Sequence, residues 1–164
     1  MRVAILTISD AGARGQRTDT SGEACETWAR ARGDEVTKRA LVPDDTGPIV
    51  STLSNWCDSD GADLILTTGG TGLSSRDVTP EATRALIERE APGIAERIRI
   101  RSLTTFPRAA LSRGIAGTRR QTLIINLPGS TGGVRDALAA IDPIIDHAIA
   151  VLRGQRLDHG ETAV

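Results

Sequence analysis

Aromatic residues and an excess of basic charge are what this sequence lacks. Its 164 residues include no tyrosine, one phenylalanine and two tryptophans, so aromatic residues make up 2% of the chain. Surfaces that stack nucleic-acid bases need such side chains. The 20 lysine and arginine residues are matched by 21 aspartate and glutamate residues, for a net charge of −1. Without a basic field to attract a phosphate backbone, we expect no nucleic-acid partner.

Cysteines and long apolar runs are equally scarce. Cys25 and Cys57 show no metal-ligand spacing, and we expect them to be packing residues in a reducing compartment. The N-terminal apolar run at residues 3–6 is too short for a signal peptide, and no other stretch approaches a membrane span. The expectation is therefore a cytoplasmic protein without a membrane partner.

The chain does contain apolar strands that alternate with amphipathic helices. Buried strands are expected at 2–9, 62–68 and 121–127, and a weaker strand of mixed polarity at 35–42, near a sheet edge. Helical spacing of apolar residues predicts helices from Asp19 or Thr20 to Gly33, at 47–59, 80–91 and 94–104, and after residue 133. Residues 105–120 show no clear period, and Pro143 is expected to kink the last helix.

This order of elements predicts an α/β fold of three layers, in which helices flank a mostly parallel sheet. We expect one domain over residues 1–153, followed by a polar tail at 154–164.

The most informative stretch is the apolar run 64–68, which leads into three glycines, Gly69, Gly70 and Gly72. Glycine adopts positive φ freely, so successive backbone N–H groups of such a turn can converge on one anion. No Lys-Ser or Lys-Thr pair follows, which excludes a P-loop. The alternative interpretation is a tight turn without a ligand.

Residues after the glycines favour a ligand site. Arg76 is a candidate to grip a phosphate, and Asp77 places an acid inside a loop that attracts anions. An acid at such a position indicates a metal ion or a reacting proton. Thr79 is expected to cap the next helix, with Pro80 as its first residue.

Ligands of parallel sheets bind beyond the carboxyl ends of the strands, so the residues at those ends should meet at one rim. These residues are Ser9 and Asp10, Asp44 and Asp45, Thr68 to Gly72, and Pro128 to Ser130. His147 and His159 lie far from the strand ends, so a hydrolytic triad is not expected.

Each candidate also has a simpler structural explanation. Ser9 and Asp10 fit an Asx turn, Asp19 and Asp77 fit helix caps, and Asp44 follows a proline as turn residues do. The hypothesis of a site therefore rests on the convergence of these residues and not on any single one.

Together these residues resemble a known signature. Residues 67–72 and 76–82, with Ser9-Asp10, Asp19 to Gly22, Pro43-Asp44 and Leu127 to Ser130, are similar to the MogA/MoaB family of molybdenum cofactor biosynthesis proteins. The similarity covers residues 1–153. One departure is Thr131, where the family often has a proline after the serine.

The resemblance implies a molybdopterin-binding domain, usually a homotrimer. Its MogA branch transfers AMP from Mg-ATP to the terminal phosphate of molybdopterin and releases pyrophosphate. A molybdenum-insertion enzyme is among the expected partners. A MoaB-type protein that binds molybdopterin without adenylation is the alternative, and an unrelated nucleotide-binding regulator is a third hypothesis.

The resemblance also implies roles for individual residues. Asp44 and Asp77 would be catalytic and would hold Mg²⁺. The residues expected to bind substrate and nucleotide are Ser9, Asp10, Asp19, Ser21, Gly22, Thr68, Gly69, Gly70, Thr71, Gly72, Arg76, Pro128, Gly129 and Ser130.

Overall fold

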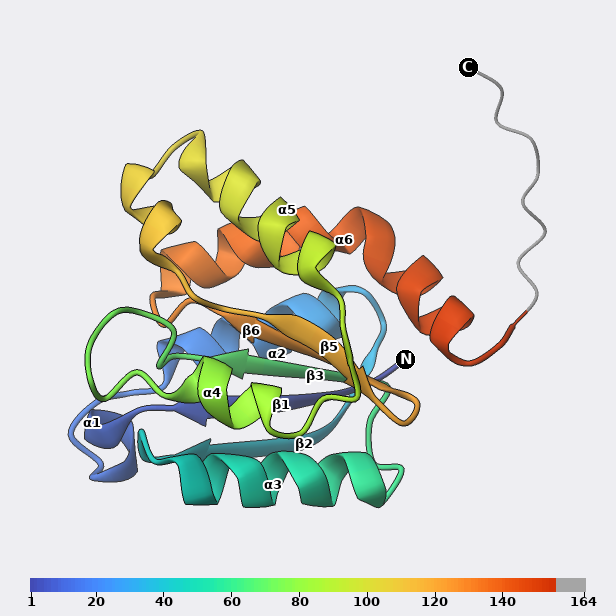
Figure 1. Ribbon diagram of the computed structural model, residues 1–164, viewed down its shortest axis with the longest axis horizontal. Coiled ribbons are helices and arrows are strands. Elements are labelled where there is room, and N and C mark those ends of the chain that lie inside the picture. Colours follow the sequence, from blue (N-terminus) through green and yellow to red (C-terminus); the bar gives the residue numbers. More distant parts are fainter. Residues whose placement is uncertain (156–164) are drawn as a thin grey trace.

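The computed structural model describes residues 1–155, which fold into a central sheet between two helical layers (Figure 1). The strands are β1 (Arg2–Ile8), β2 (Glu35–Val42), β3 (Leu64–Thr68), β4 (Arg89–Glu90), β5 (Ala116–Arg119) and β6 (Thr122–Leu127). The helices are α1 (Asp10–Ala13), α2 (Thr20–Ala31), α3 (Thr46–Asp58), α4 (Thr79–Arg84), α5 (Pro92–Leu103), the 3-10 helix η1 (Pro107–Leu111) and α6 (Thr131–Leu152).

The sheet has the strand order β2-β1-β3-β6-β5-β4. The first four of these strands run parallel, whereas β5 and β4 pair in the antiparallel sense. The predicted fold class is confirmed, and β2 lies at an edge as expected. The carboxyl ends of four parallel strands consequently meet on one side of the molecule.

Alternation along β1 shows how the sheet separates two cores. Val3 and Ile5 face the core beneath α2, α5 and α6, whereas Ala4, Leu6 and Ile8 face the core beneath α3 and α4. The side chains of β1 from Val3 to Ile8 are buried on both faces, as a continuous apolar strand requires. The described part of the chain therefore has the three layers that the sequence predicts.

The helix predicted at 80–91 is wrong in its second half. It ends at Arg84, and Arg89 and Glu90 form the edge strand β4 instead. The amides of Glu88 and Ala91 donate to the carbonyls of Thr118 and Ala116, each over 2.8 Å. Since these bonds come from a distant strand, pairing outweighs the helix propensity of the local sequence.

Residues 105–120, which show no clear period, contain η1 and the strand β5. Gly117 allows this strand to approach β4, because a Cβ there would lie 2.7 Å from the carbonyl oxygen of Arg89. Pro143 lies inside α6, and the kink stays a prediction. Of the expected polar tail, only Gly154 and Gln155 belong to the described residues, and 156–164 lie outside them.

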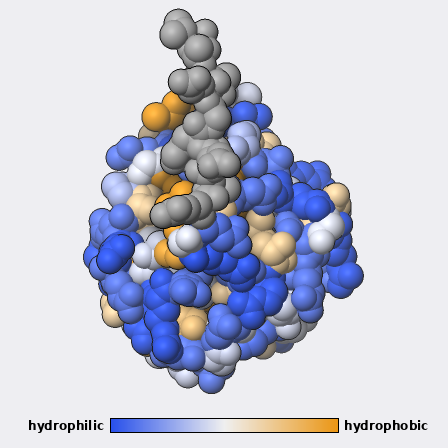
Figure 2. Space-filling model, turned by 90° about the vertical axis from the view of Figure 1, so that its right-hand side faces the viewer, coloured by the Kyte–Doolittle hydropathy of each residue, from blue (hydrophilic) through white to orange (hydrophobic). Residues whose placement is uncertain are grey.

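Asp63 stabilises the side of the sheet where the parallel strands begin, opposite their carboxyl ends. This carboxylate, 2% exposed, accepts hydrogen bonds from the backbone and guanidinium of Arg2 and from the guanidinium of Arg153. Both described chain ends thus join this side, whose surface in Figure 2 is mostly hydrophilic. None of the helices within residues 1–155 is long and apolar enough to cross a membrane.

Candidate functional site at the strand ends

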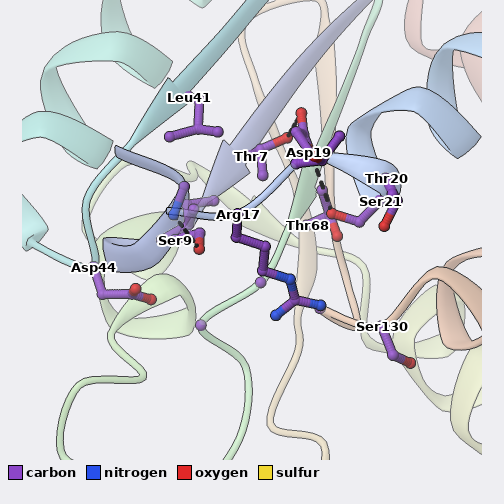
Figure 3. A pocket seen from close by; sticks show the side chains of 16 residues that line it. Thr7, Ser9, Arg17, Asp19, Thr20, Ser21, Leu41, Asp44, Thr68 and Ser130 are labelled. Atoms are coloured by element: carbon purple, nitrogen blue, oxygen red, sulfur yellow. Dashed lines mark hydrogen bonds between the residues drawn. The ribbon is translucent and has the colours of Figure 1, made fainter. Parts of the chain in front are cut away.

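A polar pocket of about 310 Å³ opens where the predicted rim lies (Figure 3). Of the residues proposed from the sequence, it is lined by Ser9, Asp19, Ser21, Asp44, Thr68, Gly69, Gly70, Gly129 and Ser130. The four strand ends therefore meet as predicted. Gly22 lies beneath this pocket, since a Cβ there would contact the side chains of Thr7 and Asp19.

A second pocket of about 510 Å³ lies beside the first and shares three residues with it, Gly70, Gly129 and Ser130. Thr71, Gly72, Asp77 and Pro128 line this second space. The other wall carries no signal in the sequence; α5, η1 with its flanking residues, and the start of α6 contribute it through Arg99, Ser102, Phe106, Arg108, Ser112 and Asp136. The glycine turn is consequently a partition with a cavity on each side.

The turn itself has the conformation that the sequence predicts. Gly69 and Gly70 have φ of 102° and 64°, which only glycine adopts without strain. A Cβ on Gly69 would lie 2.2 Å from the carbonyl oxygen of Ile8. One on Gly129 would lie 3.2 Å from the Cα of Gly69. Gly69 is thus required by backbone packing as well as by its backbone angle, and Gly129 by its close approach to Gly69.

Thr79 fixes this turn and does not cap α4. Val78 occupies the N-cap position, and Thr79 is fully buried. Its hydroxyl donates to the carbonyl of Gly69 over 2.9 Å, and its amide donates to that of Gly70 over 3.1 Å. The prediction that Thr79 is an N-cap is wrong because the carbonyls of the glycine turn compete for its hydroxyl.

Asp10, Asp44 and Arg76 form one polar network at the rim. The Asp10 amide donates to Asp44 Oδ2 over 2.7 Å, and the Asp44 amide donates to Asp10 Oδ1 over 3.1 Å. Arg76 donates to both oxygens of Asp10. Arg76 is therefore engaged by a carboxylate in this structure, and its predicted contact with phosphate requires it to change partner.

The two linked carboxylates differ in acidity. Burial raises the pKa of Asp10, but the Arg76 guanidinium and the Asp44 amide lower it, and the pKa ends below its ordinary value. For Asp44, burial and the negative charges of Asp10 and Asp77 raise the pKa above its ordinary value. The surroundings thus disfavour the ionised form of Asp44 and favour that of Asp10.

Asp77 lies against the same loop, where its Oδ2 accepts a hydrogen bond of 2.8 Å from the Ser74 amide. It does not cap α4. A Cβ on Gly72 would lie 3.0 Å from this carboxylate, and one on Gly70 would lie 3.1 Å from Asp44 Oδ1. The two acids therefore face the loop from its two ends.

Residues 1–155 contain no cluster of three or more histidine, cysteine, aspartate or glutamate side chains that could hold a metal ion alone. Mg²⁺ usually takes one or two carboxylates and fills its other positions with water and substrate phosphates. Asp44 and Asp77, which lie against the same glycine loop, fit that donor set. The residues present are thus compatible with Mg²⁺ that arrives with a phosphate substrate.

Asp19 has a structural role that accounts for its carboxylate. It caps α2 by accepting from the Gly22 amide over 2.8 Å, and it also accepts from the Thr7 hydroxyl, the Ser21 hydroxyl and Arg39. Burial raises its pKa, but these donors, Arg39 foremost, lower it below the ordinary value. The simpler explanation, a helix cap, is confirmed for Asp19.

Two helix N-termini lie at the pocket. Ser130 caps α6 by accepting from the Gly133 amide over 3.1 Å. The hydroxyls of Thr20 and Thr131, at the starts of α2 and α6, share a hydrogen bond of 2.8 Å. Thr131, the departure from the family pattern, therefore joins the two helices. Because N-termini carry partial positive charge, the pair favours an anion.

Two further arginines, Arg17 and Arg113, lie near the rim and belong to none of the predicted site residues. Arg17 lines the first pocket, and in Figure 3 its side chain extends between Asp44 and Ser130. Arg113 contacts the loop after β3 from 36 to 41 residues away. Neither belongs to a local motif that a single sequence reveals, and only the fold brings them to the site.

The two cysteines take no part in this site. Both are buried. Burial raises the pKa of the Cys25 thiol to about 12 and that of Cys57 to about 11. The prediction that they are packing residues is confirmed, since such thiols are neutral and shielded.

Comparisons with known proteins agree with this geometry. Residues 4–147 match the family described as "Probable molybdopterin binding domain". A molybdopterin adenylyltransferase of Helicobacter pylori is 35% identical over 171 residues, which cover 98% of this chain and 93% of that protein. The molybdenum cofactor synthesis protein cinnamon of Drosophila melanogaster is 40% identical over 155 residues, or 90% of this chain and 25% of that longer protein.

A solved structure extends the similarity to three dimensions. The molybdopterin biosynthesis enzyme MoaB of Thermus thermophilus superposes with a TM-score of 0.88 at 51% identity, and the alignment covers 93% of this chain and 96% of that one. The glycine turn, its carboxylates and the matched span lead to the same conclusion: this chain belongs to the molybdopterin-binding family of molybdenum cofactor biosynthesis proteins.

Proposed function

We propose that the protein is a molybdopterin adenylyltransferase that acts in molybdenum cofactor biosynthesis. The observation that carries the proposal is the pair of pockets that meet at Gly70, Gly129 and Ser130. A reaction that joins two phosphate-bearing substrates needs two spaces that meet where the phosphates react. Relatives named molybdopterin adenylyltransferase support the same activity.

In the proposed reaction an oxygen of the terminal phosphate of molybdopterin attacks the α-phosphorus of ATP. The new P–O bond forms as the bond between the α- and β-phosphates breaks, and pyrophosphate leaves with that electron pair. The attacking phosphate is already ionised at neutral pH, so no strong general base is required. The task of the protein is alignment and neutralisation of charge.

The residues of the rim suit that task. The N-termini of α2 and α6, Arg17 and the amides of the glycine turn would offset phosphate charge. Arg76 would add a guanidinium after release from Asp10. Asp44 and Asp77 would hold Mg²⁺, which supplies positive charge to the phosphates when it is bound.

The test is to incubate the purified protein with ATP, MgCl₂ and molybdopterin and to measure pyrophosphate. Release that requires all three components supports the enzyme. Molybdopterin that stays bound to the protein, without pyrophosphate, supports instead a MoaB-type binding protein without adenylation activity. If the protein neither releases pyrophosphate nor retains pterin, both proposals are contradicted.

We further propose a cytoplasmic homotrimer that passes its product to a molybdenum-insertion enzyme. The basis is the resemblance to the family, which implies a trimer as the usual assembly. Light scattering at micromolar concentration is expected to give three times the 17.3 kDa mass of the chain. A mass of one chain would contradict the trimer without bearing on the chemistry.

A further inference from the structure

Arg113 follows η1 and reaches across to the loop between β3 and α4. Its amide donates to the carbonyl of Thr71 over 2.8 Å. Its guanidinium donates to the carbonyl of Gly72 over 2.7 Å and to that of Asp77 over 2.6 Å. The same side chain pairs with the carboxylate of Glu81 in α4. One residue thus joins both arms of this loop to the helix that follows.

These bonds fix which way the amides of the loop point. A trans peptide is planar, so its N–H points opposite to its C=O. Since the carbonyls of Thr71 and Gly72 face Arg113, the amides of Gly72 and Leu73 face away from it. Gly72 lines the larger pocket, whereas Arg113 does not. Arg113 therefore sets the loop conformation from behind the pocket wall.

The bond to the Asp77 carbonyl extends this control to a carboxylate. The Ser74 amide holds the Asp77 side chain, and the Asp77 amide donates back to the Ser74 carbonyl over 3.0 Å. This small hydrogen-bonded turn has no helix or strand to stabilise it. Its place relative to the glycine turn depends on the bridge that Arg113 makes from Gly72 to Asp77.

Only a guanidinium fits this arrangement. Its planar fork presents several donors in fixed directions, so it can serve two carbonyls and one carboxylate at once. A lysine at position 113 would keep the charge and lose the fork. The Glu81 carboxylate in turn holds the guanidinium against the loop, and the hydrogen bond from Arg113 lowers the pKa of Glu81.

We propose that Arg113 is a positioning residue for adenylyl transfer, which holds the Gly72 amide and the Asp77 carboxylate in reactive geometry. This inference rests on the proposed function. Arg113 lines neither pocket of the site and acts through the loop that it holds. Its loss is expected to misplace Asp77 without removing any group that contacts substrate.

The kinetic test compares R113Q with R119Q. Arg119 is a matched control, because its guanidinium also makes hydrogen bonds to a carboxylate, Asp58, and to a backbone carbonyl, that of Leu86, but away from the loop. We expect R113Q to lower kcat about a hundredfold, as misplacement of a reacting group by about 1 Å does, with little change in KM for ATP. R113K should have a similarly low kcat, because lysine keeps the charge but lacks the planar fork. Equal losses in R113Q and R119Q would overturn the proposal.

A double-mutant cycle separates positioning from general destabilisation. If Arg113 acts through Asp77, R113Q should cost less than about twofold in kcat once D77N is present, because residues that act as a unit are strongly non-additive. A variant that only loosens the fold would lower the activity of D77N by the same factor as that of the wild type. Additive losses would therefore contradict the proposal.

Hydrogen exchange provides a readout that does not depend on activity. In R113Q, peptides that cover residues 70–78 should exchange faster, while those of β1 and β6 stay unchanged and R119Q matches the wild type. Unchanged exchange in the loop overturns the inference about Arg113. A wild-type protein that releases no pyrophosphate, with faster loop exchange in R113Q, contradicts the proposed function alone.

Discussion

The Arg76 guanidinium is bound to Asp10 through two hydrogen bonds of 3.0 Å, one to each carboxylate oxygen. Asp10 in turn is linked to Asp44 through reciprocal amide contacts. Arg76 therefore holds one carboxylate at the rim, and it lines neither of the two pockets. Arg76 has a structural role while it binds the Asp10 carboxylate and would have a binding role if it contacted a substrate phosphate instead.

The first prediction separates these roles. If Arg76 binds a substrate phosphate, R76Q should raise KM for ATP or molybdopterin about tenfold or more, the loss of one charge-assisted hydrogen bond. D10N keeps an oxygen that can accept from the Asp44 amide and frees Arg76 from the carboxylate, so it should raise KM less than R76Q does. Steady-state kinetics of both variants decide it. Equal effects of R76Q and D10N would mean that Arg76 serves only to hold Asp10.

Asp77→Asn should fold normally and lose most adenylyl transfer. The amide oxygen of asparagine can still accept from the Ser74 amide, so the turn is kept and only the charge is removed. We expect kcat to fall by about a hundredfold or more. Asp45→Asn is the matched control, because Asp45 caps α3 and asparagine is an equally good cap. Near-normal turnover in D77N would refute the catalytic role.

Asp44→Asn should lower kcat and raise Tm at neutral pH. The pKa of Asp44 is raised in the folded state, so its ionisation opposes folding and the penalty grows as pH rises from the ordinary value of 3.8. At pH 7 the variant should therefore have a higher Tm than the wild type, and the difference should vanish as pH falls below that value. Its kcat should fall about a hundredfold.

Melting curves followed between about pH 3.5 and 7 test the stability half of this prediction. A Tm for D44N below that of the wild type at pH 7 would show that the Asp44 charge is compensated by its neighbours. The activity half has its own expectation: the acid limb of the rate profile should follow Asp44, since a metal ligand must be deprotonated to bind.

Gly70→Ala should weaken molybdopterin binding and also lower stability. Alanine at a φ of 64° costs about 1–2 kcal/mol, and the added Cβ would lie 2.3 Å from the Thr79 hydroxyl oxygen. Gly33→Ala is the matched control, with a φ of 79° and no heavy atom within 4 Å of the new Cβ. It carries the conformational cost without the contact.

Thermal unfolding and molybdopterin affinity are measured for both glycine variants. G70A should lose more stability than G33A, and only G70A should lose affinity. If affinity is unchanged while stability falls, the turn is a structural element and does not cradle a phosphate.

The sequence predicts the central strands because their apolar runs are local and continuous. The run before Gly69 is buried at each position from Leu64 to Thr68, and the rule for parallel sheets then brings the strand ends together. Positive φ at Gly69 and Gly70 follows from the same turn. These features depend on residues that are neighbours in the sequence, so they can be predicted from one sequence.

What a single sequence does not show depends on partners far along the chain. Residues 88–91 have helix-forming side chains, yet they pair with β5 because the backbone carbonyls of that strand accept hydrogen bonds from their amides. Arg113 has no helical or strand period to mark it, and its role follows from carbonyls that lie 36 and 41 residues away. Nor does local spacing reveal that the Arg76 guanidinium is hydrogen-bonded to Asp10.

The buried carboxylate of Asp63 has a practical consequence. By holding Arg2 and Arg153 it keeps the first strand and the end of α6 on the side of the sheet opposite the strand ends that form the pockets. A tag, an affinity handle or a second protein fused at Met1 would therefore begin on the side away from the pocket mouth. Surface immobilisation through the amino terminus should leave both substrates free access, which makes the protein suitable for binding measurements on a sensor surface.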